Sequence, residues 1–414
     1  MRFEEFEGYK YVDGGVCAAK GFTANGLNCG INPNPEKNDL GLVFSEAECN
    51  AAGVFTQNKV KGAPVIVTRE NLKRSGGKAR AVIANSKNAN TCNANGIEIA
   101  EGMCGLVARE LNVKSEEVIV ASTGVIGMPM SLKPVEDHIK PLAKGLTKDG
   151  NDRAMTAIMT TDTVEKQVAV EFTLDGKTCR IGGMGKGSGM IHPNMATTLN
   201  FITSDVAISS DLLQRALSEL VKITFNCISV DGDQSTNDTC TVMANGLAGN
   251  AMIESEGEAY EIFKKGLYIV MLNIAKMLAA DGEGATKLII CKVDGAGSED
   301  IAMTVAKSVI CSSLLKCAIF GGDANWGRIL CAIGYADAEF DIDKVSVDMA
   351  SKVGSIAVCR NGSGVPFSEE EAAEILKDDE ISILVDLHQG ECSATAFGCD
   401  LTYDYVKING DYRS

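Results

Sequence analysis

The stretch GGMGKGSGMIHPNMATTLNF, residues 182–201, sets the pattern from which the rest of the chain is interpreted. Thr197 lies there between small and apolar residues, after a glycine-rich segment and before an expected strand. Glycine permits close backbone approach and dihedral angles that are closed to other residues, so the run predicts a shaped loop. Its glycines are Gly182, Gly183, Gly185, Gly187 and Gly189, and Lys186 is its only charged residue. The stretch therefore predicts a backbone held tightly around one hydroxyl group.

Two familiar glycine-containing motifs are absent from this stretch. A Walker A phosphate loop needs a Gly separated from the Gly-Lys pair by four residues and a Ser or Thr directly after the Lys. Arg180 and Gly187 occupy those places. The chain also contains no GxSxG nucleophile elbow. A glycine-rich turn between two buried strands, with no chemistry of its own, remains an alternative.

The residues on both sides of the stretch predict strands. Apolar and polar residues alternate over 168–174, Asp175-Gly176 makes a two-residue turn, and 177–181 returns, which is typical of a β-hairpin. The second strand of this hairpin leads into the glycine loop. After Thr197, LNFITSDVAIS predicts a strand, and Ser210 is expected to cap a helix that runs to about residue 223.

Strand and helix patterns alternate through the rest of the chain. A strand over 81–85 precedes an Asn-rich loop, and a helix follows with one apolar face over 100–111. The strand EEVIVAS ends at Ser122 and delivers Thr123 and Gly124 to a turn. Further helices are expected over 134–146, 152–159 and 298–309, with strands over 288–293 and beyond residue 345. No repeat or long linker interrupts them, and the fold class is α/β.

Composition excludes several classes of protein. The chain has 414 residues, enough for two domains, and a net charge of -16 without a basic cluster, which argues against a nucleic-acid partner. The N-terminus has no apolar signal segment, and charged residues interrupt the most apolar helical stretch, 259–278, so no membrane span is expected. The fifteen cysteines form no CxxC pair, which favours buried thiols in a reducing cytoplasm. Three histidines without metal-ligand spacing argue against a metal centre.

The segment KGSGMIHPNMATTL resembles the self-cleavage segment of the glutamate N-acetyltransferase family, also called ornithine acetyltransferases. Other stretches resemble signatures of that family, in the family's order. They are NSKNANTCNANG (85–96), ASTGVIG (121–127), IMTTDT (158–163), DGDQSTNDT (231–239), DGEGATK (281–287), GGDANWGR (321–328) and the ending INGDYRS. The resemblance thus covers the whole chain. Lys87 and Thr198 depart from the residues common in the family, Gly and Met.

The resemblance implies a two-domain layered α/β architecture of the self-cleaving, N-terminal-nucleophile type. Cleavage between Ala196 and Thr197 would give an alpha chain, 1–196, and a beta chain, 197–414, with two copies of each in a heterotetramer. Cleavage would also free the α-amine of Thr197, which has an ordinary pKa of about 7.7 to 8.0 and can act as a base toward its own hydroxyl.

The activity implied by the resemblance is transfer of acetyl from N2-acetyl-L-ornithine to L-glutamate through an acetyl ester on Thr197. Thr123 and Gly124 would stabilise the oxyanion. No metal or organic cofactor is implied, although acetyl-CoA is a possible second acetyl donor. The chain's end is expected to reach the site, anchored by a strand over 403–408. The substrate contacts implied are Thr160, Lys186, Thr197, Glu283, Asn409 and Ser414.

Two other functions fit the same residues. A self-cleaving amidohydrolase or aminopeptidase would share the nucleophile and the oxyanion donors but pass the acyl group to water. A noncatalytic binding protein could use the glycine loop to hold a carboxylate. The three differ in whether acetyl from acetylornithine reaches glutamate, reaches water, or stays in place.

Overall fold

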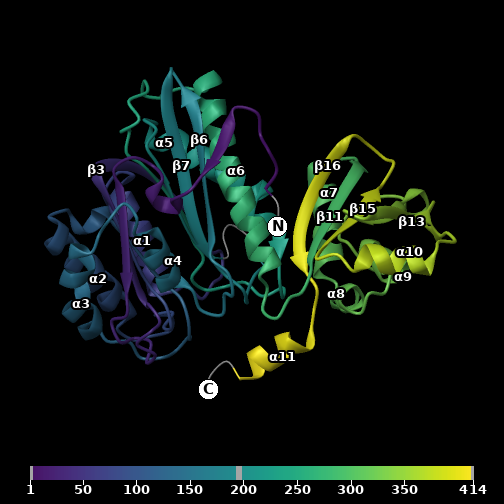
Figure 1. Cartoon of the computed structure of the whole chain (residues 1–414), viewed down its shortest axis with the longest axis horizontal. Helices are drawn as coiled ribbons and strands as arrows, with labels where there is room; N and C mark the ends of the chain where they lie inside the picture. The colour runs from purple at the N-terminus through teal and green to yellow at the C-terminus, as the bar shows by residue number, and fades with distance from the viewer. Residues whose placement is uncertain (1–2, 193–197, 412–414) are drawn as a thin grey trace.

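A computed structural model describes residues 3–192 and 198–411 and contains two β-sheets flanked by helices (Figure 1). The larger sheet has nine strands in the order β1-β6-β7-β8-β10-β3-β4-β5, with β2 paired to β3. These strands are β1 (Tyr9–Val12), β2 (Phe22–Leu27), β3 (Leu40–Phe55), β4 (Lys78–Asn85), β5 (Val118–Ser122), β6 (Lys166–Leu174), β7 (Lys177–Lys186), β8 (Leu199–Ser204) and β10 (Thr239–Ala244).

The smaller sheet has seven strands in the order β14-β13-β12-β15-β11-β16-β9. They are β9 (Ile228–Ser229), β11 (Leu288–Ala296), β12 (Ser346–Ser351), β13 (Gly354–Arg360), β14 (Ser363–Gly364), β15 (Glu380–Asp386) and β16 (Cys392–Cys399). This sheet has its own buried core, which it shares with α7 (Glu299–Cys311), α8 (Ser313–Phe320), α9 (Trp326–Gly334) and α10 (Glu369–Leu376). The expected α/β class with two layered units is confirmed.

Helices cover both faces of the larger sheet. On one face, α5 (Ser210–Leu220) and α6 (Glu258–Ala280) pack against alternate residues of β6, β7 and β10, and α1 (Ala63–Arg74), α2 (Gly96–Leu111) and α3 (Lys133–Lys144) pack against β4 and β5. On the other face lies α4 (Asn151–Ile158). β4 shows the alternation clearly, because Ile83 points to the first face and its neighbours Val82 and Ala84 to the second.

The predicted hairpin is present, but it extends further than the sequence indicated. β6 and β7 are joined at Asp175 and Gly176, both with positive φ, as a type I′ hairpin turn requires. β7 then continues to Lys186, so Gly182, Gly183 and Gly185 lie in a strand and the prediction of a loop there is wrong. Their role is close packing: a Cβ on Gly185 would lie 2.6 Å from Ile274 of α6.

Serine side chains cap several helices. The N-cap of α5 is Ser209, whose side chain accepts from the Leu212 N–H, so the prediction that Ser210 caps this helix is wrong by one residue. Ser298 caps α7 in the same way, by accepting from the N–H of Ile301. Both the strand over 288–293 and the helix over 298–309 are confirmed.

The expected boundary between alpha and beta chains does not coincide with the division into two sheets. It falls between β7 and β8, which are neighbours in the larger sheet. Ala196 and Thr197 themselves lie outside the described residues, so the cleavage stays a prediction. Over the described part of the chain, no single helix has the length and apolar composition to cross a bilayer; α7 and α8 pass that test only as a pair, bent by 58° at its break.

Candidate active site

A cavity of about 270 Å³ lies where β7 ends and where β8 and β10 begin. The three strands are aligned there, because Leu199 pairs with both Lys186 and Thr239. The turn that follows β5 closes the cavity from another side, and the C-terminal segment closes it from a third. Described residues predicted as site residues that line it are Thr123, Gly124, Thr160, Lys186, Glu283 and Asn409.

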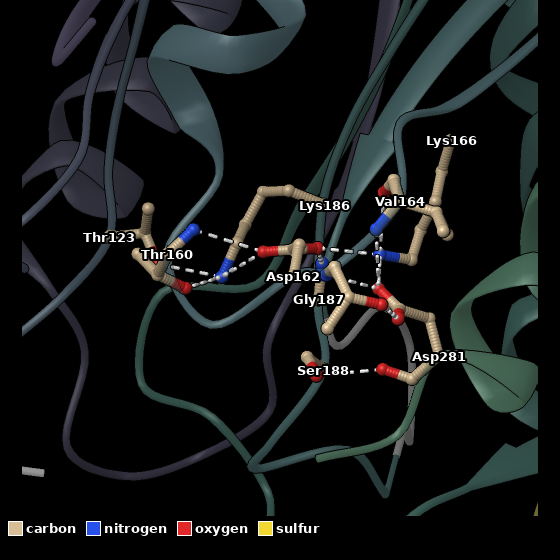
Figure 2. A network of polar contacts seen from close by, with 10 residues as sticks. Thr123, Thr160, Asp162, Val164, Lys166, Lys186, Gly187, Ser188 and Asp281 are labelled. Atoms are coloured by element: carbon tan, nitrogen blue, oxygen red, sulfur yellow. Dashed lines mark hydrogen bonds and ion pairs between the residues drawn. The ribbon is translucent and has the colours of Figure 1, made fainter. Parts of the chain in front are cut away.

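Lys186 is the positively charged residue among the described residues that line this cavity. Its Nζ donates to Thr160 Oγ1 at 2.8 Å and to Thr123 Oγ1 at 3.3 Å (Figure 2). Its side chain is 9% exposed. Burial lowers the pKa of Lys186 below its ordinary value of 10.5, partly opposed by the carboxylate of Asp162. The arrangement fixes the ammonium group with two neutral acceptors and leaves its charge directed at the cavity.

The turn after β5 brings Thr123 and Gly124 to the cavity wall. Gly124 has φ +127°, and a Cβ there would lie 2.6 Å from the backbone nitrogen of Asn88. Only glycine fits that approach without moving the neighbouring chain. Asn237, which also lines the cavity, holds the turn by donating from its side-chain amide to the Ser122 carbonyl at 2.9 Å. The geometry allows the oxyanion role predicted for Thr123 and Gly124, which stays a prediction.

Glu283 and Asn409 meet at the opposite wall. Asn409 donates from Nδ2 to Glu283 Oε2 at 2.7 Å. Asn409 belongs to α11 (Tyr403–Gly410), a helix that extends away from the smaller sheet in Figure 1, so the expected strand over 403–408 is wrong. The expected anchoring is wrong as well, since Tyr403 is 84% exposed and no residue of α11 is buried. The tail nevertheless reaches the cavity as expected; Ser414 lies outside the described residues.

Comparison with known proteins assigns the chain to a family. Residues 23–414 match the ArgJ family. The chain belongs to the ArgJ family. It is 51% identical over 394 residues to "Arginine biosynthesis bifunctional protein ArgJ 1" of Clostridium acetobutylicum, which covers 95% of this chain and 96% of the relative.

Two further relatives support the same assignment. The ArgJ protein of Caldanaerobacter subterraneus subsp. tengcongensis is 49% identical over 404 residues, 97% of this chain and 99% of its own. The "Glutamate N-acetyltransferase" of Methanocaldococcus jannaschii is 45% identical over 415 residues, 98% of this chain and 100% of its own. The resemblance to a glutamate N-acetyltransferase family is therefore confirmed, and the chain is an enzyme of that family.

Several charged residues of this ArgJ-family site were not predicted. Asp162 links the Thr160 segment to the end of β7, since its carboxylate accepts from Thr160 N–H at 3.0 Å and from Gly187 N–H at 2.7 Å (Figure 2). It lies in IMTTDT, a stretch singled out by its resemblance, but no sequence pattern pairs it with Lys186. Burial would raise the pKa of Asp162, but Lys186 and Lys166 outweigh it and hold this pKa well below its usual range.

Asp238 is a second unpredicted carboxyl group at the ArgJ-family cavity. It lines the cavity at the start of β10 and is 1% exposed. Within the part of the chain that the structure describes, its Oδ2 has no hydrogen-bond partner. Burial raises its pKa well above 3.8, against smaller opposing effects of Ser235 and Lys186. Asp238 is in DGDQSTNDT, where nothing distinguishes it from the two other acidic residues of the stretch, so its burial was not foreseen.

Proposed function

We propose that this chain transfers the acetyl group of N2-acetyl-L-ornithine to L-glutamate and yields L-ornithine and N-acetyl-L-glutamate in arginine biosynthesis. The observation that carries the proposal is the meeting of Thr123, Lys186, Glu283 and Asn409 around one cavity in a member of the ArgJ family. Thr198, which follows Thr197 in the chain, lines the same cavity. The position of Thr198 supports a role for its neighbour, Thr197, as the nucleophile of this cavity.

The proposed nucleophile is the hydroxyl of Thr197, freed by cleavage of the Ala196–Thr197 bond. In the first half-reaction, the Thr197 oxygen bonds to the acetyl carbon, and the α-amine of Thr197 takes the hydroxyl proton and passes it to the ornithine nitrogen as the bond from that nitrogen to the acetyl carbon breaks. Glutamate's neutral amine then attacks the ester, and the α-amine takes the proton that this nitrogen loses and gives it to the departing Thr197 oxygen. Thr123 and Gly124 would supply donors to the oxyanion in both steps.

The charges around the cavity suit these substrates. Both amino acids carry a carboxylate, for which Lys186 is a charge-assisted donor. Glu283 can accept from an ammonium group of either substrate, and Asn409 keeps the Glu283 carboxylate in place. The cavity, at about 270 Å³, is at the small end of ligand pockets, which favours single amino acids over larger substrates.

Assembly, compartment and donor range extend the proposal. We expect two alpha and two beta chains per assembly, with no metal or organic cofactor, and acetyl-CoA remains a possible second donor. The cytoplasm is the expected compartment, and the free state of all fifteen cysteines supports a reducing environment. Nine are buried as expected, but Cys92, Cys317 and Cys331 are exposed.

Incubation with acetylornithine, with and without glutamate, tests the proposal. We expect N-acetylglutamate to form only when glutamate is present, and acetylated protein to accumulate when it is absent. Thr197→Ala should abolish both, whereas Thr178→Ala, at the exposed far end of β7, should behave as the parent. Release of free acetate without transfer would favour the amidohydrolase, and no reaction would favour the binding protein; either outcome overturns the proposal.

A further inference from the structure

Four charged side chains lie in a row, and the first of them, Lys186, lines the cavity (Figure 2). We call Lys186, Asp162, Lys166 and Asp281, in that order, the buried charge row. Their side chains are 9%, 0%, 0% and 8% exposed. The signs alternate and sum to zero, so the row as a whole adds no net charge to the interior.

The spacing along the row is uneven. Lys166 Nζ lies 2.7 Å from Asp162 Oδ1 and 2.5 Å from Asp281 Oδ2, so it makes close hydrogen-bonded ion pairs on both sides. Lys186 Nζ lies 3.8 Å from Asp162 Oδ2, beyond hydrogen-bond distance. Asp162 is thus hydrogen-bonded to Lys166 and to the N–H groups of Thr160 and Gly187, whereas Lys186 acts on it through charge alone.

Among the described residues, no hydrogen-bonded carboxylate neutralises the positive charge of Lys186. An ammonium group has three N–H donors, and two of those of Lys186 go to the neutral hydroxyls of Thr160 and Thr123. Neither hydroxyl cancels its charge. The other charged groups that influence Lys186 are Asp162, Lys166, Glu283 and Asp238, and none of the three carboxylates makes a close ion pair with it among the described residues.

We infer that Lys166 is a positioning residue: it holds Asp162 away from Lys186 and so keeps the Lys186 ammonium group available to a carboxylate of the substrate. This inference rests on the proposed function, in which both substrates are amino acids. Lys166 is not among the described residues that line the cavity, so it acts only through Asp162. The rival explanation is purely structural, with Lys166 present only to neutralise two buried acids.

The double variant Lys166→Met/Asp281→Asn separates these explanations. It removes one charge of each sign, so the interior stays neutral, and among the described residues it leaves Asp162 with Lys186 as its one ion-pair partner, beside the N–H donors of Thr160 and Gly187. If the role of Lys166 is purely structural, the double variant should have the stability and the glutamate affinity of the parent. If Lys166 is a positioning residue, the double variant should have parental stability but bind glutamate about tenfold more weakly, as expected when a charged hydrogen bond is lost.

The pH profile gives a second, independent readout. In the double variant, the closer Asp162 should move the alkaline loss of glutamate binding to higher pH. In Asp281→Asn alone, Lys166 has only Asp162 as its acid, so glutamate affinity should stay within about threefold of the parent and the alkaline loss should move to lower pH. This single variant keeps the inference testable where the double variant does not fold, since a fall of tenfold or more in its affinity would overturn the inference.

The assay is isothermal titration of the purified protein with L-glutamate, beside the acetyl-transfer assay on the parent. A parent that neither binds glutamate nor transfers acetyl would refute the proposed function itself. A parent that does both, with a folded double variant of parental affinity and pH profile, would leave the function standing and refute the role of Lys166. Reduced affinity in that folded double variant, with the alkaline shift, would establish it.

Discussion

Removing the ammonium group of Lys186 is the most direct perturbation of the cavity. Lys186→Met keeps much of the side chain's length and apolar stem but loses the hydrogen bonds to Thr160 and Thr123 and the charge facing the cavity. A hydrogen bond to a charged group contributes about 1.5 to 3 kcal/mol. At about 1.4 kcal/mol per factor of ten, losing it should raise KM by about 10- to 150-fold.

The rise in KM should appear for both acetylornithine and glutamate, because both carry a carboxylate. Since this contact is made before and during reaction alike, kcat should change less than KM. Initial rates measured at varied concentrations of each substrate provide the test. The matched control is Lys177→Met, an exposed lysine at the other end of β7. Unchanged KM values for both substrates would show that Lys186 does not bind a carboxylate.

The pH dependence of the same variant gives a second check. Burial lowers the pKa of Lys186 from 10.5, so its ammonium form, which attracts a carboxylate, is lost on the way up to that pH. In the parent, KM should therefore rise with pH below the range of an ordinary lysine. That part of the profile should be missing in Lys186→Met, whereas ionisation of the substrates themselves affects both enzymes equally.

Three further outcomes follow from the structure. Asp238→Asn should be more stable than the parent at pH 7 in urea denaturation. Because the folded pKa of Asp238 is raised, the parent loses stability as its unfolded chain ionises above pH 3.8, so the gap should close as pH falls toward 3.8. Gly189→Ala would place a Cβ 2.5 Å from the Glu283 carboxyl carbon and should raise KM, while Gly105→Ala, with open space around it, should not. Deleting 409–414 removes the Asn409 contact to Glu283 and should strongly reduce acetyl transfer while electrophoresis still shows two fragments; parental transfer rates would contradict this.

Local sequence patterns predicted most of the fold. Alternation over 168–174 and the Asp175-Gly176 pair were sufficient for the hairpin, because both depend only on neighbouring residues. The glycines of β7 were misassigned because their reason is distant: Gly185 is small to admit Ile274, which is 89 residues away in the chain. The segment 403–408 was misassigned because alternating aromatic and branched residues favour a strand, while the helix it forms buries none of them.

Part of the site was also predictable from the sequence. The resemblance supplied Thr160, Lys186, Glu283 and Asn409, and the structure brings all four to one cavity. The ion pair of Lys166 with Asp281 was not predicted, since a lysine and an aspartate 115 residues apart carry no local sign that they will meet. Burial of charge is a property of the tertiary fold alone.

The order of strands in the larger sheet has a consequence for how the enzyme must mature. β8 and β10, which follow the expected cut, lie between β7 and β3, which precede it. A fragment ending at residue 196 would lack the two strands that join its halves, and each exposed edge would invite aggregation. The two fragments should therefore not assemble when they are made separately and then mixed. Synthesis as one chain lets β8 and β10 insert between β7 and β3 before the expected cleavage. Native size-exclusion chromatography should then show no change of size after cleavage.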